Sequence, residues 1–380
     1  MNNTTKNPFT DELILSKYRD NYYDIIGLYV PLFFTAFCAN VIVIIVVFRD
    51  QYMRSVTNYF LVNLSIADLL VTLVCMPNAA WLAYTTMYPF GKLTCKISPY
   101  LQCIAVSLSI FTITAMALDR YLAITRPFGM IYRSFSKTTT VVIIIALWVM
   151  SLVLFSPILF IYRLREDFFP TDLGLLVSVC IEDWSLFPIS QSDLGIVWFV
   201  FMFAMPGVIM LFAYSMMGRT LCSGKPPFDN DSTSTQQRNK LIKGRKRVAC
   251  ILLLLAFVFA LCWLPYHLMT LMADLGTSTG EHTKQSKRYL RLLGHANSAL
   301  NPIIYCALSR KFRRSIKNLF CVKMTFKRRR QIVKWADSSG SGTQLHYMQR
   351  LKNSPNHMNQ LNFNTSRRQS SQKTTKTFAV

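Results

Sequence analysis

Seven long apolar segments dominate the chain and restrict what it can fold into. They run from 25 to 48, 57 to 83, 92 to 124, 138 to 161, 194 to 220, 247 to 273 and 288 to 308. A helix of about 20 residues crosses the hydrocarbon core of a bilayer, so each segment is long enough to span it. Because backbone groups find no water in lipid, such segments must be helical. The sequence therefore predicts an all-α integral membrane protein, a bundle of seven transmembrane helices.

The composition agrees with a membrane protein. The chain is 52% hydrophobic and 16% charged, whereas soluble proteins are about a quarter charged. A net charge of +24 would suggest nucleic acid for a soluble protein. Here the basic residues lie between and after the apolar segments, so we expect no nucleic-acid partner.

The basic residues predict the orientation of the chain. Lysine and arginine are concentrated after the first, third and fifth segments and beyond residue 308. Loops of this kind remain in the cytoplasm. We therefore expect a multi-pass protein of the plasma membrane, with an extracellular N-terminus and a cytoplasmic C-terminus. No signal peptide is evident, so the first helix would act as its own insertion signal.

The chain outside the spans completes a predicted division into four regions. Residues 1–24 form an extracellular tail in which Asn2 and Asn3 head N-x-Thr glycosylation sequons, and residues 25–308 form the bundle. Residues 309–321 alternate basic and apolar positions, which predicts an eighth helix in the inner interface. Cys321, at its end, is either palmitoylated or an unmodified thiol. Residues 322–380 form a basic tail with the composition of a disordered phosphorylation target.

The third segment carries a polar group near each membrane face. Gln102 and Arg120 are eighteen residues apart, which is roughly 27 Å along a helix. Such a helix can connect a ligand site at one face with a partner site at the other. Arg120 either pairs with the adjacent Asp119 or extends to the interface as a snorkelling side chain.

Asp68 is the most informative ionisable residue within a span, because charged groups in lipid are costly. Oxygen-bearing side chains of other segments can converge on it as ligands for a hard cation such as sodium. These are Asn40, Ser109, Asn297, Ser298 and Asn301. From spacing alone, a hydrogen-bonded structural cluster without an ion is the favoured explanation.

Prolines interrupt several of the segments, where each removes a hydrogen bond and favours a kink. Among them are Pro77, Pro157, Pro206, Pro265 and Pro302. Trp263 lies two residues before Pro265. It is either a bulky ring against a hinge or an ordinary residue of the helix-packing core.

These features together resemble the rhodopsin-like G-protein-coupled receptors over roughly residues 25–321. The resemblance rests on motifs in the right order along the chain. They are Asn40, NLSIADLL with Asp68, Cys95, the triplet Asp119-Arg120-Tyr121, Trp148, Pro206 with Tyr214, CWLP at 262–265, and NPIIY at 301–305. Each motif is weak alone, whereas all of them in order are a specific signal.

The resemblance implies roles for these residues. Cys95 and Cys180 would form an external disulfide, and sodium would bind at Asp68, Ser109, Asn297, Ser298 and Asn301. Trp263 would be a switch below the ligand. Residues that rearrange on activation would be Asp119, Arg120, Tyr121, Tyr214, Trp263, Pro265, Asn301, Pro302 and Tyr305. The sixth helix would then swing outward and open a cytoplasmic cleft for a heterotrimeric G protein. Arrestin and receptor kinases would act at the phosphorylated tail, and no cofactor other than sodium is implied.

Two positions depart from the family pattern. Arg245 stands where many members carry an acid that pairs with Arg120, which implies that this lock is absent and that resting activity is higher. Tyr88, in YPFG, replaces the tryptophan usual in the first external loop.

The resemblance also narrows the ligand. Gln102 stands where amine receptors have an aspartate, and a neutral amide cannot pair with an ammonium group. CKISPYLQ resembles orexin and insect allatotropin receptors, although these have DRW in place of DRY. CIEDW resembles both of those receptors and the neuropeptide FF group, and Asp274 resembles an acid of neuropeptide Y and neuropeptide FF receptors.

We therefore predict a neuropeptide ligand with an amidated C-terminus, held near its amide by Gln102. The predicted ligand residues are Gln102, Tyr100, Glu182, Asp183, Tyr266, His267, Asp274, Arg291 and His295. Glu182, Asp183 and Asp274 would attract basic peptide residues, or they are solvated loop charges.

Other classes remain as alternatives. A receptor of the same family for a lipid or small molecule is the first, although the acidic external face disfavours a lipid carboxylate. A transporter or channel would carry internal repeats or broken helices with paired charges. An intramembrane enzyme would need a catalytic constellation within the spans. The sequence displays neither pattern, so we expect no enzyme.

Overall fold

The computed structural model describes residues 23–319, except 86, 126–135, 169–175, 186, 223–234 and 278–279. Residues up to Ile316 form one compact unit. The second unit begins at Lys317 and lies almost entirely outside the described residues. The described fold is therefore that of the first unit, and the predicted division into four regions stays a prediction.

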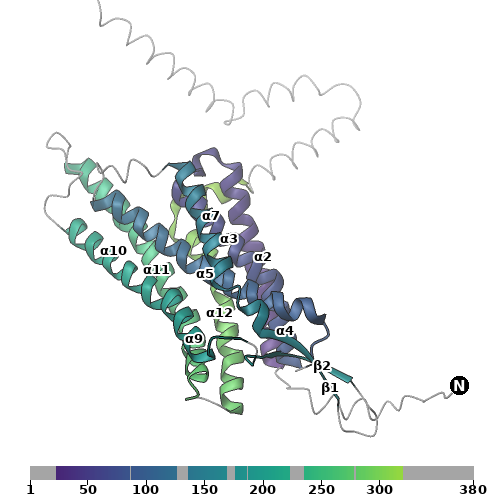
Figure 1. Ribbon diagram of the computed structural model, residues 1–380. Coiled ribbons are helices and arrows are strands. Elements are labelled where there is room, and N and C mark those ends of the chain that lie inside the picture. Colours follow the sequence, from purple (N-terminus) through teal and green to yellow (C-terminus); the bar gives the residue numbers. More distant parts are fainter. Residues whose placement is uncertain are drawn as a thin grey trace, which may run out of the picture. The chain divides into compact units, whose positions relative to one another are not determined.

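Seven helical stretches occupy the seven apolar segments (Figure 1). In chain order they are α2 (Tyr23–Arg49); α3 (Val56–Leu70), η2 (Val71–Cys75) and α4 (Met76–Tyr84); α5 (Gly91–Thr125); α7 (Lys137–Leu154) and α8 (Ile158–Ile161); α9 (Gln191–Phe199), η3 (Val200–Ala204) and α10 (Met205–Cys222); α11 (Thr235–Asp274); and α12 (Glu281–Leu308). A short turn of 3-10 helix, η1 (Gln51–Met53), follows α2. The sixth and seventh stretches begin earlier than predicted, because polar residues with good helix propensity extend them beyond the apolar cores.

Wide helical turns precede two of the prolines. The π-helical turn η2 lies before Pro77, and η3 lies before Pro206. Proline has no N–H to donate, and its ring crowds the carbonyl four residues earlier, so a locally wider turn accommodates it. Pro157 separates α7 from α8, whereas Pro265 and Pro302 lie inside α11 and α12.

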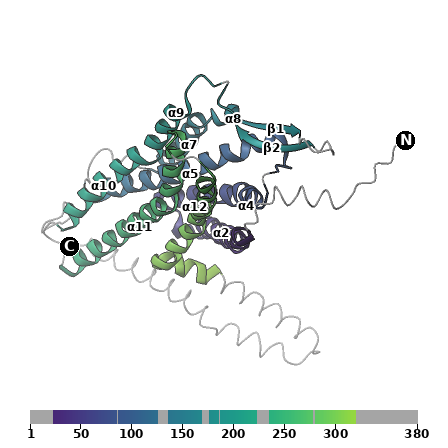
Figure 2. The same ribbon diagram turned by 90° about the horizontal axis from the view of Figure 1, so that it is seen from below.

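Helix α5 forms the centre of the bundle. It packs against α3, α7, α10 and α11, and Figure 2 shows it among the other helices. In its most apolar stretch 72% of the residues are buried, against 17% for α7 and α8. The peripheral α7 instead exposes Val142, Ile145 and Val153. An apolar outer surface of this kind is suited to lipid.

Within the described residues, six of the seven stretches are long and apolar enough to cross a membrane. The stretch that does not qualify is α12, whose first half carries Lys284, Lys287, Arg288 and Arg291. It nevertheless packs against α2 and α11. It is therefore the seventh helix of the predicted bundle.

A β-hairpin that the sequence analysis did not predict lies at one end of the bundle, beside α4 (Figure 1). Its strands β1 (Tyr162–Phe168) and β2 (Leu176–Glu182) are antiparallel, with Tyr162 opposite Glu182. The segment VSVCIE alternates in the manner of a strand, a signal that was available in the sequence. We refer to this end of the bundle as the hairpin end.

Residues 310–319 form a short helix after α12, as predicted for the eighth helix. Phe312 is buried and its ring lies 6.5 Å from that of Tyr305. The Ser315 hydroxyl donates to the Asp50 carboxylate at 2.6 Å, and Arg310 and Arg314 are exposed. An apolar and a basic face are therefore present, as expected for a helix at an interface.

Candidate functional site

A cavity of about 580 Å³ lies at the hairpin end of the bundle. Its walls are formed by residues of α2, α4, α5, α8, β1, β2, α9, η3, α11 and α12. This volume lies within the range of roughly 300–1,000 Å³ that is common for ligand pockets. The cavity is therefore the candidate ligand site.

Two attachments hold the hairpin beside the cavity. The predicted disulfide between Cys95 and Cys180 is present, with Cα atoms 5.7 Å apart. The backbone N–H of Tyr88 donates to the Ser178 carbonyl at 2.8 Å. The Tyr88 ring is buried edge-on against Phe90, and this burial raises the pKa of its hydroxyl to about 12. Tyr88 thus acts as a structural anchor in the place of the usual tryptophan.

Six of the nine predicted ligand residues line the cavity: Gln102, Glu182, Tyr266, His267, Asp274 and Arg291. Two of the others lie away from it. The Tyr100 hydroxyl donates to the Leu152 carbonyl at 2.9 Å, and His295 is fully buried inside the bundle.

Asp183 is the third predicted residue that does not line the cavity. Its carboxylate accepts hydrogen bonds from the Ser185 hydroxyl at 2.6 Å and from the Ser185 N–H at 3.1 Å. These bonds lower the pKa of Asp183. The second carboxylate oxygen lies 3.5 Å from Arg163. A charge satisfied within the loop fits this geometry better than a ligand contact.

Asp274 joins α11 to α9 at the cavity wall. Its Oδ1 accepts a hydrogen bond from Gln191 at 2.7 Å, and its backbone carbonyl accepts one from Ser192 at 2.7 Å. Gly195 leaves the space that the carboxylate occupies, because a Cβ there would lie 2.8 Å from Oδ2. The position of this acid is therefore fixed by its neighbours.

Arg291 has a different environment. Its Nη2 donates to the Tyr266 hydroxyl at 3.1 Å, and its guanidinium carbon lies 5.5 Å from the centre of the Tyr266 ring. The Nε–H is buried without an acceptor. Among the described residues, no carboxylate pairs with Arg291. Arg291 is therefore a charged residue of the cavity lining that forms no ion pair with the described residues.

Six of the cavity-lining residues carry a buried polar atom that has no hydrogen-bond partner in the described structure. The atoms are Asn78 Oδ1, Tyr88 OH, Trp184 Nε1, His267 Nε2, Thr270 Oγ1 and Arg291 Nε. Buried polar groups in proteins are nearly always paired. A concentration of them around one cavity indicates groups that a polar ligand or water satisfies.

Several lining residues were missed by the sequence analysis. Lys284, Lys287 and Arg288 line the cavity together with Arg291, and their spacing of three and four residues places them on one face of α12. This helical spacing of basic residues is a signal that the sequence contains. The described lining therefore has four basic residues against two acidic ones, Glu182 and Asp274. The cavity thus lacks the acidic character expected from the loops.

Two further polar residues of the lining were also missed. Thr270 lies one turn after Tyr266 on α11, and Trp184 directly follows Glu182 and Asp183. Helical spacing identifies the first. For the second, the prediction from the motif CIEDW covered only its two acids.

Trp263 is buried between the cavity wall and α12. Its ring centre lies 5.8 Å from that of His267, which lines the cavity, and 5.8 Å from that of His295. His295 in turn lies 3.1 Å from the Tyr29 hydroxyl. A Cβ at Gly294 would lie 2.7 Å from the Trp263 ring, so the glycine allows the ring to pack on the helix backbone.

The polar cluster predicted around Asp68 is present in part. Asp68 is 1% exposed and accepts a hydrogen bond from Asn301 Nδ2 at 3.0 Å, and Ser298 also bonds with it. Asn40 donates to the Ser298 carbonyl at 2.8 Å. Ser109 donates to the Ala105 carbonyl within its own helix at 2.9 Å.

Several buried oxygens of this cluster have no partner among the described residues: Asn40 Oδ1, Asn297 Oδ1 and Asn301 Oδ1. A carboxylate with neutral oxygens is the donor set of a hard cation, so these residues fit sodium. No group of three or more His, Cys, Asp or Glu side chains suited to other metals occurs in the described chain.

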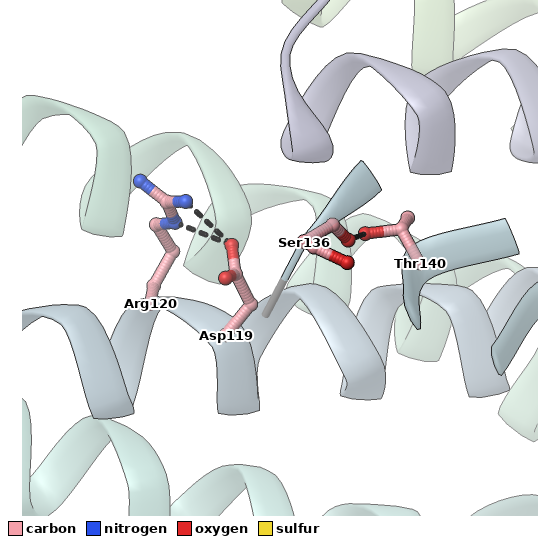
Figure 3. A network of polar contacts seen from close by, with 4 residues as sticks. All are labelled: Asp119, Arg120, Ser136 and Thr140. Atoms are coloured by element: carbon pink, nitrogen blue, oxygen red, sulfur yellow. Dashed lines mark hydrogen bonds and ion pairs between the residues drawn. The ribbon is translucent and has the colours of Figure 1, made fainter. Parts of the chain in front are cut away.

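At the opposite end of α5, Asp119 holds Arg120. The Arg120 Nε and Nη2 atoms lie 2.9 Å and 2.5 Å from Asp119 Oδ2 (Figure 3). Nearby, Thr140 donates to the backbone carbonyl of Ser136. Of the two explanations for Arg120, pairing with its neighbour is the one observed.

Three tyrosines belong to the predicted switch. Tyr121 packs against Phe212 with ring centres 5.7 Å apart. The hydroxyls of Tyr214 and Tyr305 are buried without a partner among the described residues. They are therefore available for new hydrogen bonds in another conformation.

Arg245 replaces the expected acid and still connects two helices. Its Nη1 donates to the Ala123 carbonyl on α5 at 2.9 Å. Arg247 donates to the Leu308 carbonyl at the end of α12. The inner part of α11 is thus attached to both neighbours through arginine–carbonyl bonds.

The three predicted modification sites, Asn2, Asn3 and Cys321, lie outside the described residues. Asn63, which also heads a sequon, is 3% exposed and bonds with Thr112 and Trp148, so it is an interior residue.

Comparison with known proteins decides the family. The profile described as "7 transmembrane receptor (rhodopsin family)" matches residues 39–305. The chain belongs to the rhodopsin family of seven-transmembrane receptors. The predicted fold class is thereby confirmed, and the chain is a multi-pass membrane protein of a receptor family.

Similar receptors are known from two animals. The chain is 32% identical over 295 residues to "Tachykinin-like peptides receptor 86C" and 31% identical over 287 residues to "Tachykinin-like peptides receptor 99D", both of Drosophila melanogaster. These alignments cover 76% and 74% of this chain. It is 30% identical over 296 residues, 77% of its length, to "QRFP-like peptide receptor" of Branchiostoma floridae. All three are named as peptide receptors.

The alignments do not cover the relatives completely. The chain spans 56% and 54% of the two fly receptors and 76% of the Branchiostoma receptor. The finer resemblance to orexin, allatotropin and neuropeptide FF receptors stays a prediction.

Proposed function

We propose that the receptor binds a neuropeptide in the cavity at the hairpin end and activates a heterotrimeric G protein at the opposite end. The observation that carries this proposal is the cavity of about 580 Å³, around which six residues hold a buried polar atom without a partner in the described chain. A peptide supplies many hydrogen-bond donors and acceptors. The names of the relatives give independent support for a peptide ligand.

The orientation follows from charge. Basic residues are concentrated in the links at the Arg120 end and in the chain after 308, so this end faces the cytoplasm. The hairpin end then faces outward, where its disulfide is stable. The glycosylation of Asn2 and Asn3 and the palmitoylation of Cys321 belong to the same proposal.

The two ends communicate through α5 and α11. A peptide that contacts His267 would move Trp263, which packs on α12 beside Gly294. Movement of α11 would break the bond between Arg245 and Ala123 and open a cleft for the G protein. Tyr214 and Tyr305 would then use their unpaired hydroxyls near Arg120. The peptide does this by binding the open state more tightly.

Sodium would be held by Asp68, Ser109, Asn297, Ser298 and Asn301. A bound cation offsets the cost of the buried Asp68 charge and stabilises the resting arrangement. Arrestin and receptor kinases would bind the cytoplasmic face and the basic tail, where phosphorylation adds negative charge.

A receptor for a non-peptide ligand is the second candidate. It is favoured by one observation, the excess of basic over acidic residues in the cavity lining. An anionic lipid or metabolite is attracted by this lining.

The test is a ligand screen in cells that express the full-length receptor with a promiscuous G protein and a calcium readout. The panel holds orexin-like, allatotropin-like, tachykinin-like and Arg-Phe-amide peptides, monoamines and anionic lipids. A nanomolar response to one peptide group, lost in Arg120→Ala at equal surface expression, supports the proposal. A response to a lipid or amine but to no peptide contradicts it.

A further inference from the structure

We propose that Arg291 is the centre of an anion-binding subsite, which receives a carboxylate or sulfate group of the ligand. This inference rests on the proposed function and specifies the chemistry of the same cavity. It also differs from the prediction that the ligand ends in a neutral amide and reaches the receptor mainly through basic residues.

The first argument is the missing counter-charge. Arg291 lines the cavity and pairs with no carboxylate among the described residues. Before a ligand enters, cavity water can solvate the guanidinium. A ligand that displaces this water without supplying negative charge leaves a desolvated cation, which is strongly unfavourable. An anionic group replaces the water with a charge-assisted hydrogen bond.

The second argument is the orientation of the guanidinium group. The Tyr266 hydroxyl accepts from Nη2 at 3.1 Å, and the Tyr266 ring lies beside the guanidinium with 5.5 Å between their centres. These contacts hold the group in one orientation, while Nε–H remains buried without an acceptor. A planar donor that is already fixed matches an oxyanion with two or three oxygens.

The third argument is that both acids of the described lining are already bonded to groups other than Arg291. Asp274 is fixed by Gln191 of α9, and Glu182 accepts a hydrogen bond from the Tyr162 hydroxyl at 2.5 Å. Each acid of the lining thus has its own partner. The cavity therefore offers a basic subsite on α12 as well as acids elsewhere in its lining, and fits a ligand that carries both charges.

The test uses three defined probes on the purified full-length receptor. They are N-acetyl-tyrosine, with a carboxylate; N-acetyl-tyrosinamide, its neutral counterpart; and N-acetyl-O-sulfotyrosinamide, with a sulfate and a neutral end. The readout is the rise in melting temperature with probe concentration, from which Kd follows. We expect at least one anionic probe to bind about tenfold or more tightly than the neutral one, as for a charge-assisted bond. The tighter anion identifies the source of the charge.

Variants then locate the effect. Arg291→Gln should bind all three probes about equally. Arg291→Lys, which keeps the cation, should retain a smaller preference. Lys287→Gln removes the same charge from the same helix and lining, and should reduce the preference for the anions much less than Arg291→Gln does. A low melting temperature of Arg291→Gln without probe would show that this variant is unfolded. The preference for the anions is then judged from Arg291→Lys and the unmodified receptor.

Three outcomes overturn the inference: no preference for either anion in the unmodified receptor, an unchanged preference in Arg291→Gln, or an equal loss in Lys287→Gln. The last would indicate the general field of the basic lining. Because these measurements need neither a peptide nor a G protein, failure here is distinguishable from failure of the signalling proposal.

Discussion

Gly294 controls how closely Trp263 packs on α12. A methyl group there would lie 2.7 Å from two ring carbons, and a buried aromatic ring cannot move aside without repacking. Overpacking of this kind typically costs about 1–3 kcal/mol. The cost falls on the resting position of Trp263, so alternative positions gain population.

We predict that Gly294→Ala raises basal G-protein signalling about fivefold or more, because about 1 kcal/mol shifts a two-state equilibrium by that factor. Basal inositol phosphate per receptor at the surface is the measurement. Gly27→Ala is the matched control, since nothing lies within 4 Å of a Cβ there. Equal basal signals in the two variants would show that Trp263 does not limit activation.

Asp274 and Gly195 form a second pair that can be tested. Asp274→Lys should weaken a peptide with a critical arginine by about 100-fold or more, because a charge-assisted contact becomes a repulsion. Gly195→Ala should cause a smaller loss of about tenfold, because it displaces the carboxylate without removing it. Concentration–response curves for the peptide identified in the screen measure both. Unchanged potency in Asp274→Lys would rule out this contact.

The inner part of α11 is attached through arginines. The bond from Arg245 to the Ala123 carbonyl connects the helices that separate in the proposed activation. The absence of an acid at this position therefore does not leave α11 unattached. The higher resting activity implied by the resemblance stays a prediction.

We predict that Arg245→Ala raises basal G-protein signalling about threefold to fivefold above that of the unmodified receptor. This is the effect expected for a partly exposed charged hydrogen bond worth about 1 kcal/mol. Lys246→Ala is the control, because the Lys246 side chain is exposed and forms no hydrogen bond or ion pair with the described residues. A receptor biosensor without ligand gives the measurement. If the basal signal of Arg245→Ala is no higher than that of the control, the bond between Arg245 and Ala123 contributes to stability and not to the activation equilibrium.

The helices could be predicted from sequence to different extents. Apolar length alone identifies six of the seven stretches, since lipid leaves no alternative to a helix. The seventh, α12, does not qualify by this criterion because its first half is basic. The hairpin between the fourth and fifth spans was not predicted, although VSVCIE alternates in the manner of a strand. The basic face of α12 was not predicted because hydropathy along a segment does not show which residues share one face of its helix.

Other features had no local signal. Arg245 binds a backbone carbonyl, and carbonyls are present at every position of a sequence. The bond between Gln191 and Asp274 joins residues 83 positions apart. Tyr100 was expected in the cavity, but its helical position directs it to Leu152. Contacts of this kind depend on how the helices are rotated against one another, which hydropathy leaves open.

Signalling across the membrane requires that the two ends of the bundle share one equilibrium. If the peptide favours the open state by some factor, the G protein must raise the affinity for the peptide by the same factor. The central, largely buried α5 contacts both ends, with Gln102 in the cavity lining and Arg120 at the other end. Its central, buried position makes it the natural carrier of this coupling.

We predict that a nucleotide-free G protein raises peptide affinity about 5-fold to 150-fold, the usual range of coupling between sites. Competition binding to membranes with and without the G protein and excess nucleotide is the measurement. Arg120→Ala should remove the increase while leaving the low-affinity value unchanged, because Arg120 lies outside the cavity. If Arg120→Ala instead weakened binding equally in both conditions, the mutation would act on the fold of α5 rather than on communication between the two ends.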